Sequence, residues 1–537
     1  FNLDDFTIGT NSTFRLSGNT EISSADDLTL GNLELNGNTL SLEFASVGDP
    51  AFILQNTLTM DNVGSVIETR GSNLELADAL QLNSGSITST GGTLRFTGGL
   101  TMGASGVLDV TGSTLSAGQV LDLSVGTFTS SNSSVLDLQA ATTLSSSALV
   151  SFGSLNPNGN VLTLGSASTH LKVNDPLALA GIALETGAGS LTLSGALTMS
   201  SNAKLNSSGG TITLNSGGSL ASGSTLSLPD STLVLQNALA ISASTLKTKN
   251  TTLTTNGKAL SLSAGILEVE GVQDLSGVST DGTGTLRLIA NTSLNDNAAL
   301  SVGTLDLADF ALTLDDAMAG LYVTQAVTLD AATEQIISGD ADLSLNGGIS
   351  VNAGTLSSSG GILSLPGGAT LVSGSTFTTS NTTLNLGGSL DVADTWTSTD
   401  TSIVLTDEAS LSSTEEMSLA TLDTNGYDLM LESATSDLTI TEGVTINYDG
   451  EGGLNSGEAD LTLNGSVSVL YGGILSSGGT VTFGTGSSGA SFSEENSGML
   501  LEDTTLVLQT ALDLPYLQLT GTSSFQTNGN TLNLGFL

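Results

Sequence analysis

The segment "NYDGEGGLNSGE", residues 447–458, has the spacing of oxygen ligands that binds a metal ion in loops. Asn447, Asp449 and Glu451 stand at alternate positions, so their side-chain oxygens can surround a hard cation such as Ca²⁺. Glu458 follows after a Gly-rich turn and can close the coordination shell with both carboxylate oxygens. The sequence therefore predicts a calcium site at these four residues.

Three features of this loop depart from the calcium-loop pattern. Asn stands at the first position, Glu stands at the fifth, and the flanking stretches "GVTI" and "DLTL" are typical of strands instead of helices. Residues 172–185, which correspond to this loop in the first half of the chain, lack the pattern. The alternative interpretation is an acidic, Gly-rich turn that bulges from the surface.

Other residues that could support catalysis do not form recognisable motifs. Neighbours in a strand point to opposite faces, so adjacent acids rarely share a catalytic site, and we interpret them as solvated surface residues. Pectin-hydrolase-like sequences combine His-Gly and Arg-x-Lys with paired aspartates, whereas here the single His170 precedes Leu and Arg95 precedes Phe. We therefore expect no enzyme. The acid pairs are Asp4/Asp5, Asp26/Asp27, Asp315/Asp316, Glu415/Glu416 and Glu494/Glu495.

The charge of the chain disfavours several classes of partner. It carries 52 acids against nine bases, a formal net charge of −43, and all nine bases lie before residue 288. Such a surface repels phosphate backbones and anionic membranes, so we expect no nucleic-acid partner, and divalent cations are the natural counterions. No apolar run reaches the ~18 residues that span a bilayer. The absence of Cys excludes disulfides and thiol catalysis.

Short apolar alternations of the form Leu-x-Leu recur at short, slightly variable intervals between positions 191 and 270. Their period of two predicts short strands, and three successive intervals sum to about 20 residues. Three strands per turn of about 20 residues indicate a parallel β-solenoid. Because the intervals vary, whereas left-handed hexapeptide solenoids keep coils of ~18 residues, we expect an all-β, right-handed parallel β-helix with roughly 26 coils. A β-sandwich array, the alternative, would space its strands by about 8–12 residues.

A longer period divides the chain into two. "TLVLQNAL" at 232–239 returns as "TLVLQTAL" at 505–512, an offset of 273, and "FRLSGNT" at 14–20 aligns with "LRLIANT" at 286–292, an offset of 272. No change in composition marks a linker near residue 272. We therefore expect one continuous solenoid built from two tandem repeats, residues 1–272 and 273–537.

Over its whole length the chain resembles the β-helical stalks of large bacterial surface proteins, namely autotransporter passengers and filamentous-haemagglutinin-like adhesins. The resemblance implies an extracellular or cell-surface location and a non-enzymatic, structural role in a filament or stalk. It leaves open an adhesin whose solenoid is a spacer or a binding module. The residues that carry it are the Leu-x-Leu strands, the lack of Cys, and Asn-Gly turns at Asn36, Asn158, Asn256, Asn425 and Asn528.

The ends of the expected solenoid suggest self-association. Backbone hydrogen bonds of a solenoid run along its axis, so an uncovered terminal coil is an open sheet edge, which solenoids normally cap with a polar or helical segment. Neither "FNLDDFTIG" nor "NLGFL" is a typical cap. We therefore expect head-to-tail stacking into fibres, or continuation as a longer array, with divalent cations bridging the acidic fibres.

Overall fold

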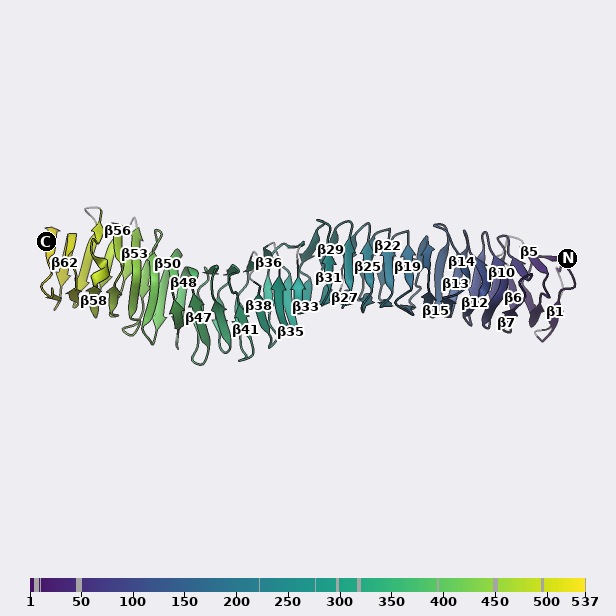
Figure 1. Cartoon of the computed structure of the whole chain (residues 1–537), viewed down its shortest axis with the longest axis horizontal. Coiled ribbons are helices and arrows are strands. Elements are labelled where there is room, and N and C mark those ends of the chain that lie inside the picture. The colour runs from purple at the N-terminus through teal and green to yellow at the C-terminus, as the bar shows by residue number, and fades with distance from the viewer. Residues whose placement is uncertain are drawn as a thin grey trace. The chain divides into compact units, whose positions relative to one another are not determined.

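The chain forms stacked, parallel β-coils, as the computed structural model in Figure 1 shows. Strands make up 61% of the chain, which forms a β-solenoid of about 24 turns, so the predicted fold class is confirmed. The described residues contain no α-helix and one 3-10 turn, η1 (Thr485–Ser487). The structure describes residues 1–3, 9, 11–44, 51–221, 223–275, 277–295, 299–315, 320–393, 396–447, 453–493 and 497–536.

Two compact units, Phe1–Leu267 and Glu268–Leu537, divide the chain. In the middle of the first unit each coil contributes one strand to each of three parallel ladders. The first ladder holds β16 (Leu149–Phe152), β19 (His170–Val173), β22 (Ser190–Leu193), β25 (Thr211–Leu214), β28 (Thr232–Leu235) and β31 (Thr252–Thr254). The second holds β20 (Leu177–Ala180), β23 (Leu197–Ser200), β26 (Gly218–Leu220), β29 (Leu239–Ser242) and β32 (Leu260–Ser263). The third includes β21 (Ala183–Gly187), β24 (Lys204–Ser207), β27 (Thr225–Pro229) and β30 (Thr245–Lys249).

The predicted coil length is found in these ladders. Leu191 lies opposite Ile212, and Ile212 lies opposite Leu233, so each coil there spans about 20 residues, the length typical of a three-strand solenoid turn. The strands match the predicted Leu-x-Leu pairs: Leu191 and Leu193 are fully buried, whereas Thr192 between them is half-buried and points outward. Burial of one such Leu contributes about 1.5–3 kcal/mol, which makes the apolar interior of the coils the main source of stability.

Coil length varies in the second unit. One of its ladders runs through β50 (Ser402–Ser413), β52 (Leu429–Leu431), β54 (Gly453–Asn455), β57 (Gly473–Ser476), β60 (Gly498–Glu502), β62 (Leu512–Thr520) and β64 (Leu532–Phe536). The register partners Leu429 and Leu454 enclose a coil longer than those in the middle of the first unit, whereas Met499 and Leu517 enclose a shorter one. Since longer coils outnumber shorter ones, the chain makes about 24 turns instead of the roughly 26 expected.

The Asn-Gly turns connect adjacent coils. Each turn Asn adopts the left-handed conformation, with φ between 48° and 53°, which Asn tolerates better than most residues. Each side-chain amide also donates a hydrogen bond to a carbonyl oxygen of the preceding coil at 3.0–3.2 Å. The turn Asn therefore closes one coil and attaches it to the previous one. The residues are Asn36, Asn158, Asn256, Asn425 and Asn528.

Substitution of Asn425 separates these two contributions. Asn425→Ala forces a side chain with a Cβ into the left-handed region and loses the bond to the Leu405 carbonyl, so we expect a destabilisation of about 2–3 kcal/mol. Asn425→Gly keeps the backbone unstrained and loses only the bond, about 1 kcal/mol. Urea unfolding measured by the fluorescence of Trp396, in the same unit, tests this order. A Gly variant as unstable as the Ala variant would contradict it.

Contacts between coils recur at the long period found in the sequence. Arg15 pairs with Glu34 at 2.5 Å, and Arg287 pairs with Asp306 at 2.8 Å, which is the same contact one long repeat later. The side chain of Asn19 accepts a hydrogen bond from the backbone of residue 39, and Asn291 accepts one from residue 311, both at 3.0 Å. The two halves therefore share local contacts as well as sequence. The expected repeat boundary at residue 272 lies within β33 (Ile266–Asp274).

Candidate functional site

The predicted calcium site lies only partly within the described residues. Asp449 and Glu451 fall outside them. Asn447 ends β53 (Leu438–Asn447), where its backbone N–H donates to the Thr424 hydroxyl at 3.0 Å, and Glu458 is exposed in a turn. The described residues contain no group of three or more His, Cys, Asp or Glu able to hold a metal ion. Calcium binding at Asn447, Asp449, Glu451 and Glu458 therefore stays a prediction.

The flanks of this loop are strands, as the sequence indicated. The stretch "GVTI" lies in β53, and "DLTL" leads into β55 (Leu461–Leu463), which is the register partner of β53. The segment 447–458 also contains β54, so a strand separates Glu458 from Asn447. A cation bound by both Asn447 and Glu458 would have ligands on both sides of this strand in the sequence.

The paired acids that the structure describes in full lie at the surface. The carboxylate of Asp27 accepts a hydrogen bond from the Ala51 backbone at 2.8 Å, and that of Glu416 accepts one from the Thr439 hydroxyl at 2.8 Å. Both acids connect one coil to the next, which agrees with their interpretation as solvated surface residues. The pairs at residues 4–5 and 494–495, together with Asp316, lie outside the described residues.

His170 points outward from β19. Its Nε2 lies 2.9 Å from the hydroxyl of Thr192, which belongs to β22 on the next coil, and partial burial lowers the pKa of its imidazole. This contact connects two coils in the same way as the contacts of Asp27 and Glu416. The structure therefore gives His170 a position between coils, half-buried on an outer face.

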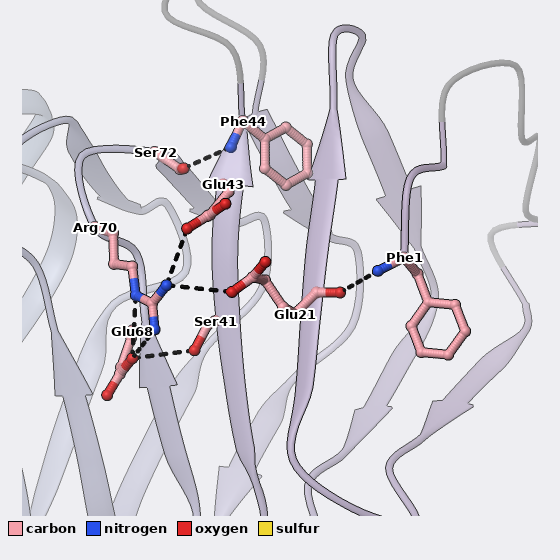
Figure 2. Close-up of polar contacts among 8 residues, drawn as sticks. All are labelled: Phe1, Glu21, Ser41, Glu43, Phe44, Glu68, Arg70 and Ser72. Carbon is pink, nitrogen blue, oxygen red and sulfur yellow. Dashed lines mark hydrogen bonds and ion pairs between the residues drawn. The ribbon is translucent and has the colours of Figure 1, made fainter.

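Arg70 contacts three carboxylates (Figure 2). Its guanidinium contacts Glu21 at 3.3 Å, Glu43 at 3.0 Å and Glu68 at 3.1 Å. Hydrogen bonds with Glu68 and then Glu43 raise the pKa of Arg70 further above its usual range. One cation thus offsets the repulsion among carboxylates that stack along the axis. The three acids come from β2 (Thr20–Ser24), β5 (Thr39–Phe44) and β8 (Val66–Glu68).

The other arginines also pair with acids on neighbouring coils. Arg15, Arg95 and Arg287 each form an ion pair with the acid directly opposite on a neighbouring coil, and the register partners are Glu34, Glu75 and Asp306. Opposite charges directly across a ladder stabilise strand pairing, and like charges destabilise it. Since all four arginines lie before residue 288, this compensation is confined to the first unit and the first coils of the second.

The two units differ strongly in charge. Residues 1–267 contain 18 acids and eight bases, whereas residues 268–537 contain 34 acids and one base, Arg287. The formal charges are therefore −10 and −33. The sequence of the second unit supplies almost no positive charge to offset the repulsion among its carboxylates.

Asp503 provides a pH-dependent contact between coils. Its Oδ1 accepts hydrogen bonds from the Thr522 backbone N–H at 2.6 Å and from the Thr522 hydroxyl at 2.8 Å. Both bonds lower the pKa of Asp503, and the backbone bond has the larger effect. A carboxylate whose pKa is lower in the folded state contributes stability above its unfolded pKa, about 3.9, and that contribution disappears as pH falls through its folded pKa.

Asp503→Asn keeps a residue that tolerates the left-handed backbone at this position, where φ is 49°, and removes the charge. We expect the variant to be less stable than the parent at pH 7, and the difference to shrink at pH 3. Hydrogen exchange of β63 (Ser524–Gln526), which follows Thr522, measures the effect. A difference that grows towards pH 3 would contradict this assignment.

The fold and these contacts define the class of the protein: it is a parallel β-solenoid whose coils are attached by asparagine turns and by ion pairs between neighbouring coils. No family model, curated protein or solved structure matches the chain. No helix among the described residues is long and apolar enough to cross a membrane.

Proposed function

We propose that the chain is a non-enzymatic, extracellular structural protein that forms or extends a filament or stalk by end-to-end stacking of β-solenoid coils. The observation that carries this proposal is the parallel ladder itself. Within each unit, strand pairing runs from coil to coil in parallel register, so a force along the axis acts on a series of backbone hydrogen bonds. A protein built in this way is suited to act as a rod that holds other molecules apart or connects them.

The coil containing β64 supports the end-to-end step. β64 pairs with β62, and its outer edge offers backbone N–H and C=O groups to a further strand. Leu532 and Leu534 occupy inward positions beneath Leu512 and Leu514, yet they are half-buried where their partners are buried. One more coil, from another copy or from more of the same polypeptide, would cover this apolar surface and satisfy the edge.

The test is the size of purified particles as a function of concentration, by sedimentation velocity and electron microscopy. We expect particles to lengthen as concentration rises. Leu534→Lys places a charge on the inward, half-covered position and should abolish lengthening, whereas Asn533→Lys, on the outward neighbour, should preserve it. Particles that remain single at every concentration would refute end-to-end stacking and favour the adhesin alternative, in which the solenoid is a spacer.

The proposed location has a separate test. Surface proteins that depend on a continuous core can dispense with disulfides, and the strong negative charge keeps copies apart unless divalent cations bridge them. We therefore expect the chain in its native cells to be removed by protease added outside intact cells. Full protection under conditions in which a known surface protein is cleaved would contradict an extracellular location.

A further inference from the structure

A shallow hollow with an apolar floor lies on an outer face of the second unit. It has a volume of about 400 Å³ and runs along the ladder of β50, β52, β54 and β57. Met430, Asn455 and Leu475 are successive register partners on this ladder, and all three point away from the core. Leu500, the next partner in the row, is 38% exposed. Three of these four outward positions are therefore apolar.

This composition differs from that of a corresponding outer face in the first unit. There, the row of register partners through β24 and β27, which correspond to β57 and β60 in the long repeat, presents the polar side chains of Asn206 and Ser227. Met430 is 45% exposed, and Leu475 lies in the same row with one residue, Asn455, between them. Contiguous exposed apolar surface rimmed by polar residues commonly marks a site of interaction with another protein.

The rim of the hollow is acidic. Glu408, Asp428 and Glu432 line it, and an adjoining hollow of about 470 Å³ shares Met430, Glu432 and Asn455 and adds Glu458. The sequence has no Lys or Arg after residue 287, so neutralisation of this rim has to come from outside these coils. An apolar floor with a negative rim is complementary to a segment that carries both apolar and basic side chains.

We propose that this hollow binds a cationic amphipathic peptide segment of another protein. Its apolar side chains would contact Met430 and Leu475, which are two coil spacings or about 10 Å apart along the axis. Its Lys or Arg side chains would pair with Glu408 and Glu432, which lie on opposite sides of β52 in the sequence. This binding role is independent of the proposed end-to-end stacking, because the hollow lies on an outer face.

The probe is a fluorescein-labelled peptide, a dodecamer that alternates Lys and Leu, titrated with the full chain at 150 mM NaCl and followed by fluorescence anisotropy. Comparison peptides alternate Lys with Ser, or Glu with Leu. Because the floor should contribute at least one buried apolar side chain, we expect the Lys-Leu peptide to bind at least about tenfold more tightly than the Lys-Ser peptide. The Glu-Leu peptide should not bind.

Two pairs of substitutions separate the hollow from general charge attraction. Met430→Ser with Leu475→Ser should weaken binding of the Lys-Leu peptide by about tenfold or more. Glu408→Gln with Glu432→Gln should also weaken it and reduce its salt dependence. The matched control, Glu415→Gln with Glu416→Gln, removes the same charge from a turn that lines neither hollow and should change affinity by less than about twofold.

Folding of each variant is checked by its Trp396 fluorescence melting curve, since all the substituted side chains except Leu475 are exposed and Leu475 is half-buried outside the core. Three results would overturn the proposal: no binding of the Lys-Leu peptide, equal affinity for the Lys-Ser peptide, or an equal loss in the Glu415/Glu416 control. A wild-type dimer that the Met430/Leu475 variant converts to monomer in sedimentation would overturn it as well, because it would assign the face to a second copy.

Discussion

Replacement of Leu363 by Ala is expected to lower the free energy of unfolding of the second unit by about 2–5 kcal/mol. Leu363 is fully buried between Leu343 and Leu384, its register partners on the coils before and after it. Loss of its side chain leaves a cavity that stacked backbone on both sides cannot close. Trp396 reports the unfolding because its indole stacks on Phe377 in the same unit, with ring centroids 5.2 Å apart.

The neighbouring residue is the control. Ser364 belongs to the same strand, β45 (Ile362–Leu365), but points outward, so Ser364→Ala should change stability by no more than about 0.5 kcal/mol. Both variants unfold in urea and are followed by the same fluorescence. Equal effects of the two substitutions would contradict the assignment of alternate residues to the interior and the surface.

Salt should stabilise the second unit. Between 20 mM and 500 mM NaCl we expect a gain of at least about 1 kcal/mol, or roughly 2–4 °C in melting temperature for a domain of this size. The physical reason is that salt screens the repulsion among the 34 acids of this unit, which contains a single base. Melting followed by Trp396 fluorescence measures the effect, and millimolar MgCl₂ should reproduce it at lower concentration because a divalent cation screens more strongly.

The first unit is the internal control for the salt experiment. Its charge is −10, and Arg15, Arg70 and Arg95 already offset carboxylates on neighbouring coils. Hydrogen exchange measured by mass spectrometry reports both units in one sample, so salt should slow exchange in β42 (Leu343–Leu345) and β45 more than in β22 and β25. Equal slowing in both units would mean that charge density does not limit the stability of the second.

The repeating core could be predicted from the sequence because each coil carries its own signal. Leu191 and Leu193 flank Thr192, and the same alternation returns one coil later at Ile212 and Leu214. Period and step size together define strands and coils without any long-range information. The number of coils was overestimated because insertions, such as the one that lengthens the coil between strands β52 and β54, leave the apolar alternation unchanged. The right-handed winding stays a prediction from coil length.

The sequence does not predict the hydrogen bonds among buried Ser and Thr hydroxyls. The Thr69 and Ser113 hydroxyls both donate to the Ser89 hydroxyl, at 2.8 and 2.7 Å, and all three side chains are buried. Ser and Thr also occupy the outward positions, so residue type alone does not distinguish the two environments. The ion pairs, in contrast, can be predicted from the sequence. Once the coil length is known, acids one coil away from Arg15 and Arg95 are the expected partners.

The candidate sites could be predicted only in part. The calcium loop was chosen from local spacing, and two of its four residues lie outside the described residues. The apolar hollow gave no local signal, because Met430 and Leu475 become neighbours of Asn455 only through the register of three coils, one of them lengthened. Sites that depend on register between coils of unequal length require the structure.

The stacking of coils in register underlies both the proposed stalk and the proposed binding hollow, and cysteine pairs test it directly because the chain has no Cys of its own. Thr192 and Thr213 are register partners on adjacent coils, about 4.8 Å apart, whereas Thr192 and Val234 are two coils apart. With a short bifunctional thiol reagent, Thr192→Cys/Thr213→Cys should cross-link within the chain, and Thr192→Cys/Val234→Cys should not. Cross-linking of the second pair in preference to the first would contradict the account.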